Sequence, residues 1–372
     1  MKVKCARGPI HEAFQLALTV VPQRSTIPAV TNVKLTASGT GKNAQLEVAC
    51  TDLEFGLKIR VPAVEVKEEG TVVLPAARMA GILREAGDAD VSIDSDGTLA
   101  HVKASGASFK IVGIDPADFP AVPGFEEKGA VQVDTKDLGE MIRKTQFAVS
   151  GEVVRYALTG QLFEIRGKEL RMVASDGKRL AYIRSRAGGK AGDAKPLRVI
   201  VPTKTMNLLD RVLTDEDDTV WVHIEETQIR LKTARAMIFS RLIDGNFPDY
   251  EAVIPSDRDK KVTLDREPLH AAVRKASLMT TDKTRAVRFT FAKDKLTLFT
   301  RTQDVGEANV EVPIEYKGDE IDITFNPDYV ADYLKVVTEE AVELHLKDRT
   351  SAGVFKSGKD YVYVLMPLTV NL

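Results

Sequence analysis

The side chains that most often perform chemistry are scattered in this chain. Its five histidines form no HExxH pair, and none has a cysteine at ligand spacing; they are His11, His101, His223, His270 and His345. A zinc ion is held by clustered nitrogen and sulfur ligands, so the sequence predicts no metal site. Cys5 and Cys50 are too few for a disulfide framework, which is typical of a reduced, cytoplasmic protein.

Other catalytic patterns are equally weak. The segment "GTGKN" (39–43) ends like a phosphate-binding loop, but it lacks the first glycine and the Ser or Thr after the lysine, so a hairpin turn is the better interpretation. No G-x-S-x-G occurs, and the acidic pair in "DSDG" (94–97) has a turn context. The sequence therefore predicts that the protein is not an enzyme.

Composition limits the class of protein further. The chain has 372 residues, of which 44% are hydrophobic and 28% are charged, as in ordinary globular proteins. No apolar run approaches the length of a membrane span and the first residues contain no apolar signal core, so we expect a cytoplasmic protein without a membrane partner. Because the formal net charge is −2, binding to nucleic acid would require basic residues gathered on one face.

The elements that would position any site follow a threefold repeat. "KVKCARGPIHEAF" (2–14), "AVQVDTKDLGEMI" (130–142) and "KVTLDREPLHAAV" (261–273) share one pattern of an alternating strand followed by a helix. Three further trios follow in the same order, and one of them places Pro75, Pro202 and Pro327 at helix starts. The closing trio is "IDPADFPAVP" (114–123), "IDGNFPDYEAVIP" (243–255) and "YVYVLMPLTVNL" (361–372). The repeat predicts three copies of one domain, at 1–126, 127–256 and 257–372.

Each copy contains two strand-then-helix units separated by hairpins. Alternating segments such as "VWVHI" and "FTFAKDKLTLF" favour antiparallel sheets with one buried face, so the predicted class is α+β. Two chains would carry twelve such helices. At roughly 9 Å between helix axes, twelve helices in a circle enclose a hole about 34 Å across, which is wide enough for a nucleic acid duplex.

Several segments resemble the β subunit of bacterial DNA polymerase III, the bacterial sliding clamp family. They are "RSTIPAVTNV" (24–33), "ASDGKRLA" (174–181), "DGNFPDY" (244–250) and "YVYVLMPL" (361–368), and they occur in the family's order along the whole chain. The resemblance implies a head-to-tail homodimeric ring of six clamp domains, with sheets outside and helices lining the lumen. Such a ring encircles duplex DNA, tethers DNA polymerase III core and other polymerases, is loaded by a clamp loader complex, and needs no cofactor.

The resemblance also implies which residues bind. Basic residues of the repeat helices and adjoining loops would face DNA phosphates without reading bases, although a solvated helix face is the alternative for each; they are Arg24, Arg84, Arg143, Lys144, Lys204, Arg211, Arg274 and Lys275. Arg24 matches the family's DNA-contacting arginine. Glu152 suits DNA less well than the neutral or basic residue expected at its position.

Partner proteins of the family insert a short hydrophobic peptide into a pocket between the second and third domains. Its predicted wall consists of Leu158, Ser175, Gly177, Lys178, Arg179, Leu180, Pro248, Val253, Thr284, Asn326, Tyr329, Val364, Met366, Pro367 and Leu368. Thr284 replaces an aromatic residue found in many members, and the "TVNL" tail is longer than usual. From the residues alone, "ASDGKRLA" is also a tight Asp-Gly hairpin, and both interpretations can hold.

For the dimer interface, the family pattern indicates an edge strand of the first copy against a helix end of the third. The residues are Phe109 and Ile111 against Leu278 and Met279, with Arg78 facing Asp304 or Glu307. A core strand is the alternative for Ile111. Two other classes of protein stay open: a repeat-built scaffold that binds proteins without DNA, and an enzyme with sites between repeats, for which the sequence offers no cluster.

Overall fold

The computed structural model describes residues 1–62, 64–87, 90–186, 197–214, 218–257 and 259–370. The described chain forms two compact units: unit 1 contains residues 1–136 and 204–242, and unit 2 contains residues 137–186, 197–203 and 243–370.

The order of elements repeats three times, except that copy one has an additional strand and copy two an additional helical turn among the described residues. Copy one contains β1 (Lys2–Ala6), α1 (Arg7–Ala17), β2 (Asn32–Ser38), β3 (Gln45–Thr51), β4 (Phe55–Val61), β5 (Val64–Glu68), β6 (Gly70–Pro75), α2 (Ala76–Glu85), β7 (Asp90–Asp96), β8 (Leu99–Ala104) and β9 (Ala107–Val112). Copy two contains β10 (Val131–Asp134), α3 (Thr135–Gln146), β11 (Gly160–Arg166), β12 (Glu169–Ser175), β13 (Arg179–Arg186), β14 (Leu197–Pro202), α4 (Thr203–Val212), β15 (Thr219–Ile224), β16 (Gln228–Lys232), β17 (Ala236–Arg241) and the single turn α5 (Tyr250–Val253). Copy three contains β18 (Lys260–Asp265), α6 (Arg266–Ser277), β19 (Val287–Ala292), β20 (Lys295–Thr302), β21 (Gly306–Pro313), β22 (Ile321–Phe325), α7 (Pro327–Val336), β23 (Ala341–Leu346), β24 (Gly353–Ser357) and β25 (Tyr361–Leu365).

The strands form antiparallel sheets, as the sequence predicts. Unit 1 contains a sheet of order β5-β1-β7-β8-β9 and a sheet of order β10-β15-β16-β17-β4-β3-β2-β6. Unit 2 contains a sheet of order β14-β11-β12-β13-β25-β24-β23-β18 and a sheet of order β21-β20-β19-β22. Strands β9 and β21 therefore lie at the edges of their sheets.

Neighbouring copies share a sheet at each junction. In unit 1, the last strand of copy two pairs with the fourth repeat strand of copy one, and Ile238 of β17 faces Leu57 of β4. In unit 2, the last strand of copy three pairs with the equivalent strand of copy two, and Tyr363 of β25 faces Ala181 of β13. The same pairing therefore joins copies one and two and joins copies two and three.

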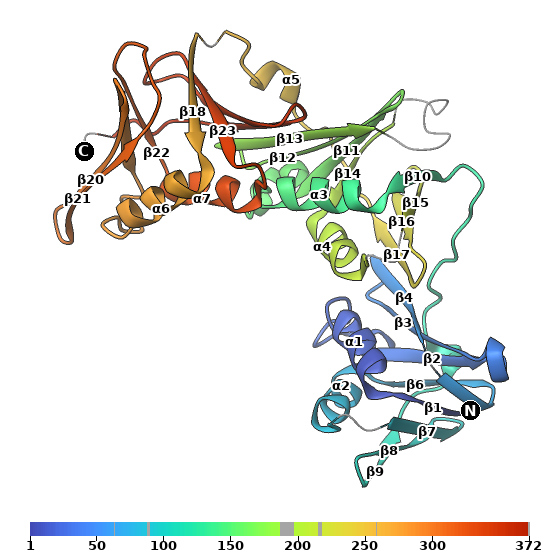
Figure 1. Cartoon of the computed structure of the whole chain (residues 1–372). Helices are drawn as coiled ribbons and strands as arrows, with labels where there is room; N and C mark the ends of the chain where they lie inside the picture. The colour runs from blue at the N-terminus through green and yellow to red at the C-terminus, as the bar shows by residue number, and fades with distance from the viewer. Residues whose placement is uncertain (63, 88–89, 187–196, 215–217, 258, 371–372) are drawn as a thin grey trace. The chain divides into compact units, whose positions relative to one another are not determined.

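Helix spacing explains how the helices bury against these sheets. In α1, the buried residues Ile10, Ala13, Phe14 and Ala17 recur every three or four positions, so they form one apolar face. Burying a side chain such as Phe14 contributes about 1.5–3 kcal/mol. Figure 1 shows α1 beside α2 in unit 1 and α6 beside α7 in unit 2, and both helix pairs are in contact.

The helix starts differ from the prediction at two of the three prolines. Only Pro327 is the first residue of its helix, whereas Pro75 and Pro202 end the preceding strands and the helices start one residue later. Within the described residues, every helix is too short or too polar to cross a lipid bilayer.

Candidate functional site

An apolar cavity of about 160 Å³ lies in unit 2, where copies two and three share their sheet. Three segments supply its wall: the turn between β12 and β13, the region around α5, and the end of β25. The lining residues are Ser175, Gly177, Lys178, Arg179, Leu180, Phe247, Pro248, Tyr250, Val253, Val364 and Met366. Val253 and Met366 are 47% and 48% exposed, so the cavity presents apolar surface to solvent. Contiguous exposed apolar surface is typical of interaction sites, which makes this cavity a candidate binding site.

The turn between β12 and β13 is fixed by its own side chains. Ser175 Oγ donates to the Arg179 carbonyl at 2.8 Å, and Asp176 Oδ1 accepts from the backbone N–H groups of Lys178 (2.8 Å) and Arg179 (3.0 Å). Gly177 has φ 85°, a conformation that glycine adopts without strain. The predicted Asp-Gly hairpin is confirmed.

Arg179 is the most heavily contacted residue of this turn. Its guanidinium donates to Asp176 Oδ2 at 3.0 Å, to Asp332 Oδ2 at 2.9 Å and to the Phe147 carbonyl at 2.6 Å, and it lies 4.1 Å from the centre of the Tyr329 ring. Burial alone lowers the pKa of Arg179, but Tyr363 and these carboxylates raise it above its ordinary value. The wall residue is thereby held as a cation in one orientation.

Nine of the fifteen predicted pocket residues line this cavity. A tenth, Leu158, belongs to the buried hydrophobic cluster that includes the lining residues Leu180, Tyr250 and Val364. The wall does not include Thr284, Asn326, Tyr329, Pro367 or Leu368. Asn326 accepts a hydrogen bond from the Asp328 N–H and so caps α7, while the Tyr329 ring contacts the guanidinium of the wall residue Arg179. Thr284 belongs to the 281–284 turn, and the N–H of Leu368 donates to the Thr324 carbonyl.

The predicted DNA-facing residues are not all accessible. Arg24, Arg84, Arg143, Arg211, Arg274 and Lys275 are exposed. Lys204 is half-buried; its ammonium lies 2.7 Å from Asp52 Oδ2 and over the Phe55 ring. The prediction for Lys144 is wrong, because its side chain is 3% exposed, pairs with Glu140 and Glu339, and lies over the Tyr361 ring.

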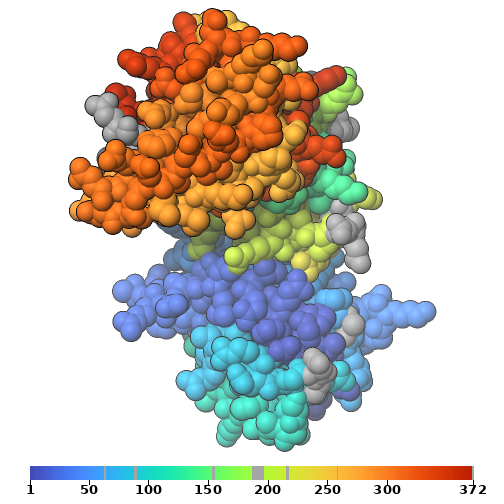
Figure 2. All heavy atoms as spheres, turned by 60° about the vertical axis from the view of Figure 1, so that its left-hand side comes forward, coloured from blue at the N-terminus to red at the C-terminus, as the bar shows by residue number. Residues whose placement is uncertain are grey.

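The predicted interface residues lie in both units. Phe109 and Arg78 are exposed in unit 1, and the neighbouring Val112 is 70% exposed. Leu278 is 72% exposed in unit 2, Asp304 and Glu307 are exposed, and Met279 is half-buried. Figure 2 shows this part of copy three in orange at the surface. The prediction for Ile111 is corrected: it is 4% exposed and belongs to the core face of β9.

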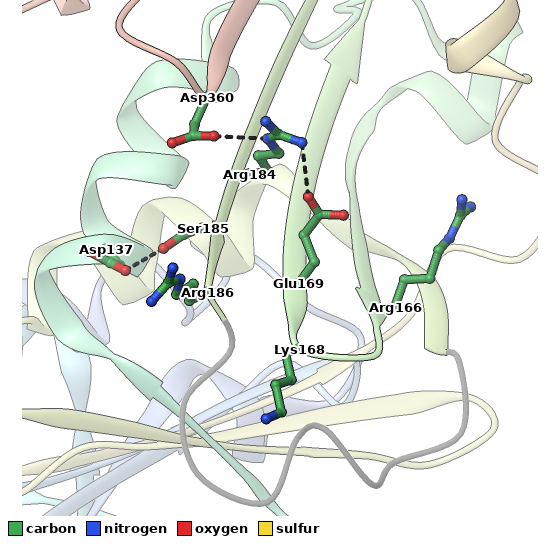
Figure 3. Close-up of a pocket in the computed structure, with 8 residues that line it drawn as sticks. All are labelled: Asp137, Arg166, Lys168, Glu169, Arg184, Ser185, Arg186 and Asp360. Carbon is green, nitrogen blue, oxygen red and sulfur yellow. Dashed lines mark hydrogen bonds and ion pairs between the residues drawn. The ribbon is translucent and has the colours of Figure 1, made fainter.

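A second, polar cavity lies in unit 2 beside the β11–β12 hairpin, and no feature of the sequence analysis predicts it. Figure 3 shows its lining, which mixes four basic residues with three carboxylates and Ser185. Arg184 donates to Asp360 at 2.8 Å and to Glu169 at 3.3 Å, so it links copy three to copy two. Ser185 donates to Asp137 at the start of α3. Arg184 is thereby paired with two of the three carboxylates of the lining.

Phe247 and Tyr250 are the wall residues that sequence reasoning missed. Both belong to the "NFPDY" motif, which therefore contained the signal. Among the described residues, no group of three or more His, Cys, Asp or Glu side chains is arranged to hold a metal ion.

The fold and the apolar cavity together define a class, a three-copy α+β protein with an apolar surface cavity where two copies join. Comparison with known proteins identifies the family. Residues 1–123, 132–249 and 251–369 match the N-terminal, central and C-terminal domains of the DNA polymerase III beta subunit.

Relatives cover the full length of the chain. The beta sliding clamp of Pseudomonas putida is 33% identical over 97% of this chain and 98% of its own, and that of Caulobacter vibrioides is 31% identical over 100% of both. The crystal structure of the Pseudomonas aeruginosa sliding clamp bound to griselimycin superposes with a TM-score of 0.91 at 32% identity and covers 100% of both chains. The chain belongs to the DNA polymerase III beta subunit family, which confirms the predicted family and fold class.

Proposed function

We propose that the protein is a DNA sliding clamp: two copies close into a ring around duplex DNA and tether polymerases through the apolar cavity of unit 2. Members of this family are non-catalytic processivity factors, and the sequence likewise offers no catalytic cluster. The observation that carries the proposal is the apolar cavity, whose exposed wall comes from two copies of the repeat.

The repeat supports closure of the ring. Three closing segments are equivalent, because each makes one matching backbone hydrogen bond, from Ile114 N–H to Val73, from Ile243 N–H to Ile200 and from Leu368 N–H to Thr324. The residue five positions before each donor is therefore also equivalent in the three copies. These residues are Phe109, Ile238 and Tyr363. Since Ile238 and Tyr363 both face the preceding copy, Phe109 lacks the corresponding partner within its own chain among the described pairings.

The missing partner strand is supplied by a second copy of the chain. In the chain, Ile238 faces Leu57 and Tyr363 faces Ala181. The residue at the equivalent repeat position of copy three is Ala308, in the edge strand β21. Pairing β9 of one copy with β21 of another would place Phe109 opposite Ala308 and would cover both edges. Two such contacts between two copies close the ring head to tail. Exposed Phe109, Val112, Leu278 and Val305 supply apolar surface for it.

The remaining partners follow from the ring. Duplex DNA would pass through it without base readout, held loosely by the exposed basic residues of the helices. The six domains would run over 1–126, 127–256 and 257–372 of each copy. A closed ring around DNA requires a clamp loader to open it, and a replication protein of this kind would work in the cytoplasm.

The test measures binding of a peptide. A fluorescent Gln-Leu-x-Leu-Phe peptide is titrated with the protein and with a variant lacking residues from Met366 onward. We expect saturable binding in the micromolar range that the deletion abolishes. Val253→Asp should also abolish binding, whereas Leu18→Asp, at an exposed position outside the cavity, should not. Absence of binding by the intact protein would contradict the proposal.

A further inference from the structure

The wall segment α5 is too short to hold its own position. It has four residues, Tyr250–Val253, and its helical hydrogen bond runs from the Ile254 N–H to the Tyr250 carbonyl at 3.2 Å. A single helical turn is unstable in isolation, because forming the first turn fixes several residues for one hydrogen bond. Contacts with neighbouring strands must therefore set where Tyr250 and Val253 stand in the cavity wall.

Tyr250 makes the central contact. Its ring is 2% exposed and stacks on Tyr182 with 5.6 Å between ring centres. Its hydroxyl donates to Glu164 Oε2 at 2.8 Å and accepts from Arg171 Nη1 at 3.1 Å. Burial raises the pKa of Tyr250, so the hydroxyl stays a neutral donor. One atom of the wall residue is thus fixed from two strands, β11 and β12.

Glu164 behind it is a buried carboxylate. Its side chain is 5% exposed, and Arg166 Nη2 lies 2.9 Å from its Oε1. Arg171 Nη1 lies 3.8 Å from Oε2. A buried carboxylate without partners is strongly destabilising, so this position tolerates little rearrangement. The carboxylate is therefore a rigid acceptor for the Tyr250 hydroxyl.

Arginine side chains also donate hydrogen bonds to residues before and within α5. Arg198 of β14 donates to the carbonyls of Phe247 (3.1 Å) and Pro248 (3.3 Å). Arg171 and Arg166 both donate to Glu251 Oε1, at 2.5 and 3.0 Å. Residues of three strands therefore hold segment 247–251, and none of these arginines belongs to the cavity lining.

We propose that Glu164, Arg171 and the hydroxyl of Tyr250 form a polar anchor that positions α5 and keeps the peptide pocket in its binding-competent shape. This inference rests on the proposed function, because it concerns the same cavity. Glu164 and Arg171 are absent from the cavity lining, so they act as positioning residues. Tyr250 contributes its ring to the wall and its hydroxyl to the anchor.

The anchor predicts a particular kinetic signature. If α5 leaves its position part of the time, the apparent affinity for peptide equals the intrinsic affinity multiplied by the fraction of chains that are competent. The bound complex keeps every wall contact in Tyr250→Phe, since the ring is retained. The loss should therefore appear in the association rate, whereas loss of a wall contact, as in Val253→Ala, should raise the dissociation rate.

The experiment compares Tyr250→Phe and Glu164→Gln with the unmodified full chain in stopped-flow binding of the labelled Gln-Leu-x-Leu-Phe peptide. We expect each variant to bind about threefold to tenfold more weakly through slower association. The matched control is Tyr316→Phe, because Tyr316 is also buried and its hydroxyl donates to the Asp319 carbonyl. Hydrogen exchange of segment 247–255 should accelerate in both variants and stay unchanged in the control.

The outcomes separate the two proposals. Equal association rates and equal exchange in Tyr250→Phe and the unmodified chain would overturn the anchor while leaving the pocket intact. No binding by the unmodified chain would overturn the proposed function and the anchor with it. If Glu164→Gln does not fold, as a melting curve would reveal, Tyr250→Phe alone decides, because it removes a single oxygen atom.

Discussion

Two lysines at equivalent helix positions have opposite surroundings. Lys144 of α3 is buried between Glu140 and Glu339, and the Tyr361 hydroxyl donates to its carbonyl. Lys275 of α6 is exposed. A buried cation with two carboxylates contributes to the fold, whereas an exposed cation is available to phosphate.

Substituting each lysine should therefore have a different effect. We expect Lys144→Ala to lower the free energy of unfolding by about 1–3 kcal/mol, because it leaves two carboxylates without their partner. Lys275→Ala should leave stability unchanged and reduce the salt dependence of DNA binding by about one phosphate contact. Thermal melting and DNA titrations at several salt concentrations measure both. A Lys144→Ala protein of unchanged stability would refute this assignment.

Glu251 gives the pocket a pH dependence. Its neighbours are Arg166, Arg171 and the Tyr250 hydroxyl. The hydrogen bond from Arg171 and the charge of Arg166 lower the pKa of Glu251, although burial acts in the opposite direction. A carboxyl group with a lowered pKa stabilises the fold above its unfolded pKa of about 4.3, and that stabilisation disappears as pH falls through the folded value.

Peptide affinity should accordingly be flat between about pH 6 and pH 9 and fall below about pH 4.3. Glu251→Gln should remove part of the acid-side decline, because the residue can no longer be protonated. Fluorescence polarisation across this range measures it. Superimposable profiles for the variant and the unmodified protein would show that Glu251 does not contribute.

At the scale of elements, the repeat predicts one specific register between β9 of one copy and β21 of another, with Phe109 opposite Ala308. Facing residues of antiparallel strands have Cα atoms about 4.5–5.5 Å apart, which a disulfide can bridge. We expect the double variant Phe109→Cys, Ala308→Cys to form covalent dimers on oxidation. The slipped pair Phe109→Cys, Val310→Cys should cross-link much less. The native Cys5 and Cys50 are buried and should not interfere. Non-reducing electrophoresis distinguishes the registers, and preferential cross-linking of the slipped pair would contradict the one proposed.

Sequence patterns predicted the elements whose causes are local. The 175–180 turn depends on Asp176 and Gly177, which act within a few residues. The alternation of apolar and polar residues in a strand likewise indicates which face of that strand is buried. Lys144 was assigned wrongly because its burial depends on Glu339 and Tyr361, which lie about two hundred residues further along the chain. The anchor was missed for the same reason, since Glu164 and Tyr250 meet only after β11 and α5 are placed.

For the whole molecule, the small negative net charge is compatible with a DNA clamp, because a closed ring retains DNA without strong attraction. A chain with a formal charge of −2 is not expected to hold DNA by bulk attraction. A closed ring needs no tight contacts, because DNA cannot leave until the ring opens, and weak phosphate contacts allow sliding. Retention should therefore depend on whether the DNA has ends.

The most direct test uses the Phe109→Cys, Ala308→Cys protein. A clamp loader complex and ATP load the reduced protein onto circular plasmid, the ring is then sealed by oxidation, and the DNA is washed at about 1 M salt, where phosphate contacts are screened. The account predicts that sealed protein stays on circular DNA and is released when a restriction enzyme linearises the plasmid. Equal loss from circular and linear DNA would contradict a ring that encircles the duplex.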